Sequence, residues 1–184
     1  MSKIFFALVF VFSFECFAHD VVFVGDSITT GSYPSYFCDI LKENCLSSCR
    51  VYARTGATSD KISGYVFDAI IDGDFSDLVV YAGINDCEIE RSRSEVVIDN
   101  IRYIAELGVL LGVKVVVLTI HVDTLCSERI NDWLYLYSDF YLFDVIDTDV
   151  FSGADSFFND GIHLTELGNI ELAEALFYQR DWSC

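Results

Sequence analysis

Basic residues are scarce in this sequence of 184 residues. Lysine and arginine together number 11, against 29 aspartates and glutamates, and the formal net charge is -18. Nucleic acids and anionic membrane surfaces would repel such a chain, so we expect neither as a partner. The acidic side chains are interpreted as a solvated surface that keeps the protein soluble.

The chain also lacks internal repeats, low-complexity stretches and linkers, and it holds one proline. Its length suits a single domain with its own core, and an apolar fraction of 53% with 16 Phe and 10 Tyr supports a dense interior. The spacing of its cysteines and histidines matches no zinc site. We therefore predict one domain over residues 19–184, without a metal.

The N-terminal apolar run, Ile4–Phe14, is too short to span a bilayer comfortably. Lys3 precedes it, and the small residues Cys16 and Ala18 follow it, which is the pattern of a secretory signal peptide. We predict that residues 1–18 are a signal peptide and that the mature protein is secreted or periplasmic, with no stable membrane anchor. An uncleaved anchor is the alternative, which N-terminal sequencing would distinguish.

Six cysteines would remain after cleavage of the signal peptide. An even number in an exported chain predicts disulfide bonds, but the sequence does not select among the possible connectivities. Cys87 and Cys126 each follow a predicted strand at the same edge of the sheet, so we predict that they pair. The six are Cys38, Cys45, Cys49, Cys87, Cys126 and Cys184.

Strand and helix patterns alternate along the chain. The runs Val21–Val24, Leu78–Ala82 and Lys114–Ile120 are almost continuously apolar, which is typical of strands buried on both faces. This alternation predicts an α/β fold with a parallel sheet between helices. Shorter strands are predicted at Arg50–Ala53 and Tyr141–Ile146, a turn at Cys45–Cys49, and helices at Ser35–Lys42, Ser59–Ile71, Ser94–Leu107 (ending at Gly108), Glu128–Phe140 and after Thr165.

Polar residues follow several of these strands. Ser27, Gly56 and Asn85 come after the first three strands, and His163 lies in the loop before the last helix. The carboxyl ends of parallel strands meet at one edge of the sheet, so we expect these residues to converge there. Ser27 alone would equally suit a helix N-cap, and Gly56 alone an ordinary turn. Together they indicate acyl transfer.

Each residue suits a role in that chemistry. A serine hydroxyl is a weak nucleophile until a base takes its proton, and His163 can act as that base near neutral pH. Asp160, three residues before His163, can orient the imidazole. The backbone N–H groups of Ser27 and Gly56 and the amide of Asn85 can form an oxyanion hole.

Four segments resemble the four ordered blocks of the SGNH (GDSL) hydrolase family: Gly25–Ile28, Gly56, Gly83–Asp86 and Asp160–His163. They span nearly the whole mature chain in family order. The resemblance implies a flavodoxin-like three-layer α/β/α sandwich whose five-stranded parallel sheet has the order 2-1-3-4-5. It implies Ser27, Asp160 and His163 as the catalytic residues, and Ser27, Gly56 and Asn85 as the oxyanion hole.

The resemblance implies a secreted serine esterase that needs no cofactor and cleaves carboxylic esters or thioesters through an acyl-serine. Ile28 stands where the family commonly has leucine, a change that removes no catalytic group. Lipid-type, short acyl and carbohydrate O-acetyl esters all remain open as substrates. An acyltransferase and a catalytically silent glycan- or lipid-binding module are the alternatives. His121, after the fourth predicted strand, is interpreted as a structural or rim residue.

Overall fold

The computed structural model describes residues 19–44, 47–89, 93–122, 124–148 and 158–182, so the predicted signal peptide lies outside it. Five parallel strands form one sheet in the order β2-β1-β3-β4-β5. This is the α/β topology and strand order that the resemblance implies. The strands are β1 (His19–Gly25), β2 (Ser47–Ala53), β3 (Asp77–Tyr81), β4 (Lys114–Leu118) and β5 (Phe143–Ile146).

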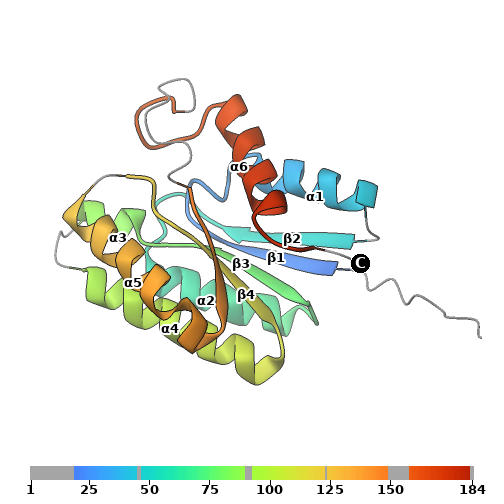
Figure 1. The fold of residues 1–184 in the computed structure, drawn as a ribbon, viewed down its shortest axis with the longest axis horizontal. Coiled ribbons are helices and arrows are strands. Elements are labelled where there is room, and N and C mark those ends of the chain that lie inside the picture. The colour runs from blue at the N-terminus through green and yellow to red at the C-terminus, as the bar shows by residue number, and fades with distance from the viewer. Residues whose placement is uncertain (1–18, 45–46, 90–92, 123, 149–157, 183–184) are drawn as a thin grey trace, which may run out of the picture.

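Helices cover both faces of the sheet, which gives three layers (Figure 1). α1 (Tyr33–Asn44) and α6 (Glu166–Tyr178) pack together on one face, and the other four described helices lie on the opposite face. These four are α2 (Ser59–Ile71), α3 (Ile84–Ile89), α4 (Ser94–Leu111) and α5 (Leu125–Tyr141). Within the described residues, no helix is long and apolar enough to cross a membrane.

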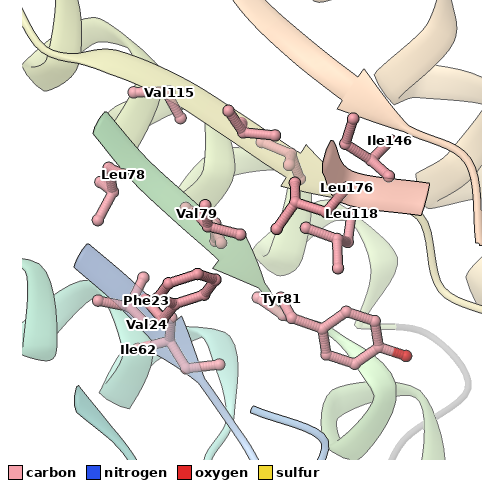
Figure 2. Packing of buried hydrophobic residues seen from close by; sticks show 14 of the residues in the cluster. Phe23, Val24, Ile62, Leu78, Val79, Tyr81, Val115, Leu118, Ile146 and Leu176 are labelled. Atoms are coloured by element: carbon pink, nitrogen blue, oxygen red, sulfur yellow. The ribbon is translucent and has the colours of Figure 1, made fainter. Parts of the chain in front are cut away.

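The central strands are buried because helices cover them from both sides. Val22, Phe23 and Val24 of β1 are fully buried, as are Val79 and Val80 of β3. Figure 2 shows part of this cluster, with side chains of β1, β3 and β4 filling the space between the layers. Burial of each such side chain contributes about 1.5–3 kcal/mol to folding. The core thereby fixes the strand ends on which the polar residues sit.

The helix expected to stop at Gly108 continues to Leu111. Gly112, with φ of 70°, caps it instead. Gly108 is buried where α4 crosses β4, and a Cβ there would lie 2.3 Å from Cγ2 of Val115. The glycine is therefore needed for close packing of the helix on the sheet and not for a turn.

Other boundaries also differ from the prediction, by a few residues in most cases. β2 begins at Ser47, inside the predicted Cys45–Cys49 turn, because its backbone pairs with the whole of β1. Tyr141 belongs to α5, and Leu142, with φ of 58°, turns the chain into β5. The stretch after Gly83, where no helix was predicted, forms the short helix α3.

Within the described residues, two disulfides join helices to other elements. The predicted pair is confirmed: Cys87 of α3 and Cys126 in the first turn of α5 have an S–S distance of 2.04 Å. A second bond joins Cys38 of α1 to Cys49 of β2. Cys45 and Cys184 lie outside the described residues. The Cys87–Cys126 bond crosslinks the helix that carries Asn85.

Candidate active site

Ser27 lies on a tight turn directly after β1. The turn is closed by hydrogen bonds from the Thr30 N–H to the Asp26 carbonyl and from the Thr30 hydroxyl to the Ser27 carbonyl. Gly25 is required at the strand end, because a Cβ there would lie 2.0 Å from Oγ1 of Thr29. The Ser27 side chain is half-buried. The turn thus presents its hydroxyl at the carboxyl edge of the sheet.

His163 reaches Ser27 from a compact loop before α6. Its Nε2 lies 3.0 Å from the Ser27 Oγ, and its Nδ1 lies 2.8 Å from Oδ2 of Asp160. The other oxygen of Asp160 accepts the backbone N–H groups of Ile162 and His163, at 3.0 and 2.7 Å. Gly161, with φ of 82°, allows the loop to turn this tightly. The three predicted catalytic residues are joined by hydrogen bonds.

The partners of His163 determine which of its nitrogens carries the proton. A carboxylate only accepts hydrogen bonds, so Nδ1 donates to Asp160 and Nε2 is left to accept the Ser27 hydroxyl. Hydrogen bonds from His163 and Ile162 lower the pKa of Asp160 to about 2, which keeps it ionised at neutral pH. This is the tautomer in which an imidazole can take a proton from serine.

Gly56 and Asn85 lie on the two segments next to the serine turn. Gly56, with φ of 73°, sits in a turn closed by the Ala57 N–H and the Arg54 carbonyl. The Asn85 amide donates to the Ala57 carbonyl at 3.0 Å and to Oδ2 of Asp26 at 3.2 Å. Asn85 therefore bridges the second sequence block and the first.

Asp26 is a fully buried carboxyl group directly before Ser27 in the chain. Burial raises its pKa to about 7, although the N–H of Ile28 and the nearby His163 act to lower it. One oxygen accepts the Ile28 N–H at 3.0 Å and the other accepts the Asn85 amide. Asp26 thus holds both the serine turn and the Asn85 side chain.

No protein-family model matches this sequence, and a search of curated proteins finds no match. Solved structures do match. The acetyl xylan esterase AlAXEase superposes with a TM-score of 0.72 and 17% identity, over 88% of this chain and 100% of its own. A member of the lipolytic G-D-S-L family from Veillonella parvula gives 0.74 and 19%, over 88% and 99%. The chain has the SGNH hydrolase fold.

A third match agrees with this fold. The acetylxylan esterase Axe2 from Geobacillus stearothermophilus superposes with a TM-score of 0.72 and 16% identity, over 90% of this chain and 96% of its own. The SGNH fold thus accounts for nearly all of the described chain. The four sequence blocks lie at the carboxyl ends of β1, β2 and β3 and in the loop before α6.

Two residues to which the sequence analysis assigned no role, Asp86 and Asn169, hold segments around the site together. Buried Asp86 accepts the backbone N–H and the hydroxyl of Ser59, at 2.8 and 3.0 Å, and so ties α3 to the start of α2. Asn169 of α6 accepts the Tyr33 N–H and donates to the Thr165 carbonyl. Ser59 lies 27 residues from Asp86 and Tyr33 lies 136 residues from Asn169, so no local pattern identifies these contacts.

A cavity of about 490 Å³ lies between α3 and the segment that runs from the end of β4 into α5. Apolar side chains, two hydroxyl side chains, the Cys87 end of the disulfide and one carboxylate line it: Ile84, Cys87, Glu88, Ile120, Val122, Thr124 and Ser127. A larger cavity, about 770 Å³, lies at the amino ends of β4 and β5, away from Ser27. Among the described residues, no cluster of three or more His, Cys, Asp or Glu side chains could hold a metal ion.

Proposed function

We propose that this protein is an exported serine esterase that cleaves carboxylic esters through an acyl-serine intermediate. The observation that carries the proposal is the hydrogen-bonded chain from Ser27 through His163 to Asp160. The two disulfides in the described residues support export, because such bonds persist in oxidising compartments. The signal peptide predicted over residues 1–18 is the second reason for proposing export.

The reaction has two steps. The Ser27 oxygen attacks the ester carbonyl carbon while Nε2 of His163 takes its proton, and the carbonyl oxygen becomes an oxyanion. The intermediate collapses, and the departing alcohol receives the proton from Nε2. A water molecule then gives a proton to His163 and attacks the acyl-serine, which releases the acid and restores Ser27. Asp160 stays ionised and stabilises the imidazolium throughout.

The oxyanion hole comprises the backbone N–H groups of Ser27 and Gly56 and the side-chain amide of Asn85. The amide has two protons, and its longer bond, to Asp26, is the one that a developing oxyanion would share. Because α3, Asp86 and the Cys87–Cys126 disulfide hold Asn85, the donor needs little reorganisation during the reaction.

Asn85→Ala should lower kcat by about 100- to 1,000-fold with a small change in KM, because one oxyanion donor is lost. The measurement is steady-state hydrolysis of p-nitrophenyl acetate. Asn100→Ala, which removes an amide that bonds Ser59 and Asp60, is the matched control and should keep kcat within about twofold. An unchanged kcat for Asn85→Ala would remove Asn85 from the oxyanion hole.

The substrate is a neutral ester with a short or lipid-type acyl group. A carbohydrate O-acetyl ester is the second candidate, since two of the superposing structures are acetylxylan esterases. The cavity between α3 and the start of α5 has both apolar and hydroxyl side chains in its wall, together with the Glu88 carboxylate. That carboxylate and the net charge of -18 disfavour anionic substrates.

The proposal is tested with p-nitrophenyl esters from acetate to palmitate, using the oxidised mature protein beside Ser27→Ala. Turnover that depends on Ser27 and is confined to acetate would support a deacetylase, and assays on acetylated xylan would follow. Turnover that rises with chain length would support a lipid or thioester substrate. Transfer of the acyl group to the hydroxyl of an added sugar, in preference to water, would identify an acyltransferase. Ligand binding with no turnover would contradict the proposal and favour a binding module.

A further inference from the structure

The catalytic mechanism does not use His121, yet this histidine contacts the loop that carries Asp160 and His163. His121 follows β4 and is partly buried beneath that loop. Its Nε2 lies 2.8 Å from the carbonyl oxygen of Ile162, the residue directly before His163. Its Nδ1 lies 2.8 Å from the hydroxyl of Tyr81 at the end of β3. The imidazole thus connects the sheet to the catalytic loop.

The two partners define the protonation state of His121. A carbonyl only accepts hydrogen bonds, so Nε2 carries a proton and donates it to Ile162. Nδ1 then accepts the Tyr81 hydroxyl. Burial is the main reason that the pKa of His121 is lowered, and the nearby His163 lowers it further. Burial also raises the pKa of Tyr81, which therefore keeps its proton. Both hydrogen bonds are satisfied by a neutral imidazole.

His121 also packs against the start of the loop. Its ring stacks on Phe158, with centroids 4.6 Å apart and an angle of 19° between the planes. Phe158 pairs with Leu164 in an isolated antiparallel bridge, and the Asn159 N–H donates to the His163 carbonyl at 2.8 Å. His121 therefore contacts both sides of this closed loop, whose tip at Asp160 and Gly161 is exposed.

The backbone under His121 is held as well. The Asn131 side chain of α5 accepts the Ile120 N–H and donates to the Ile120 carbonyl, at 2.8 and 2.9 Å. Tyr81, the other partner of His121, is fully buried, and Figure 2 shows its ring extending past the end of β3. A side chain fixed in this way can hold a loop without moving with it.

We propose that His121 is a positioning residue. It holds the Asp160–His163 loop in the position from which Nε2 of His163 reaches the Ser27 hydroxyl. The inference rests on the proposed esterase function. Without the Ile162 contact, the loop keeps its own internal hydrogen bonds but loses the hydrogen bond that fixes its backbone to the end of β4. Displacement of a catalytic group by about 1 Å lowers a rate by about 100-fold.

His121→Phe keeps an aromatic ring against Phe158 and removes both hydrogen bonds. We expect kcat for p-nitrophenyl acetate to fall by about 10- to 100-fold, with KM within about threefold of the parent value. His121→Gln can still donate an amide N–H to Ile162, so it should regain most of that loss. His19→Gln, which removes a buried histidine bonded to Asp77 at the other end of the sheet, is the control and should lower only the melting temperature.

A second readout is independent of activity. In the parent, the proton shared by His163 Nδ1 and Asp160 should give a downfield imidazole N–H signal, which should broaden or shift in His121→Phe. Unchanged His163 signals, or a kcat within twofold of the parent, would overturn the positioning role. If His121→Phe fails to fold, Tyr81→Phe replaces it and should lower kcat at least about threefold; an unchanged kcat would overturn the inference.

These readouts also separate the two proposals. Parent protein without turnover that depends on Ser27 would contradict the esterase, while the NMR comparison would still decide whether His121 orients the loop. Active parent protein with an unaffected His121→Phe variant would contradict only the positioning role.

Discussion

Ser27→Ala should lower kcat for p-nitrophenyl acetate by about 10⁵- to 10⁶-fold, because it removes the atom that forms the acyl intermediate. The fold should persist. The Ser27 side chain bonds only His163 among the described residues, and the turn is held by backbone groups and by the Thr30 hydroxyl. Circular dichroism and the melting temperature check the fold, and steady-state kinetics check the rate.

A fluorophosphonate probe provides a direct test of the nucleophile. The parent should gain one adduct, which peptide mass spectrometry assigns to Ser27, and Ser27→Ala should gain none. Ser32→Ala, an exposed serine five residues further along the chain, is the matched control and should behave as the parent does. Activity of Ser27→Ala within tenfold of the parent, or labelling elsewhere, would show that another group is the nucleophile.

Asp160→Asn should lower kcat by about 10⁴-fold with little change in KM. The new amide oxygen can still accept the N–H groups of Ile162 and His163, so the loop is kept. The new NH₂ group, however, faces Nδ1 of His163 and donates to it. The imidazole proton then moves to Nε2, which points at Ser27 and can no longer accept its hydroxyl. Kinetics on p-nitrophenyl acetate measure the loss.

Asp139→Asn, on an exposed carboxylate of α5, is the matched control and should leave kcat unchanged. The pH dependence of stability gives a further check on Asp160. Because folding lowers its pKa from 3.8 to about 2, its contribution to stability is fully present above about pH 4 and is lost as the pH falls toward 2. Asp160→Asn should lack this component in acid unfolding. Full activity of the variant would show that Asp160 does not orient His163.

The sequence by itself determined the layered architecture and the positions of the polar blocks. Runs such as Val21–Val24 are uniformly apolar, as strands covered on both faces are, and their alternation with helix patterns predicts the parallel sheet. Once the strands are parallel, Ser27, Gly56 and Asn85 must share an edge. The same argument predicted the Cys87–Cys126 bond, because both cysteines follow strands at that edge.

The tertiary structure decided what local patterns do not encode. Gly108 resembles a helix stop in sequence, but contact with Val115 makes it a packing residue inside α4. The contacts of His121 are likewise not encoded locally, since its partners Tyr81 and Ile162 lie 40 and 41 residues away in the chain. A residue's own neighbours in sequence determine its backbone preference and its burial pattern. Which distant carbonyl or hydroxyl its side chain bonds depends on how the layers pack.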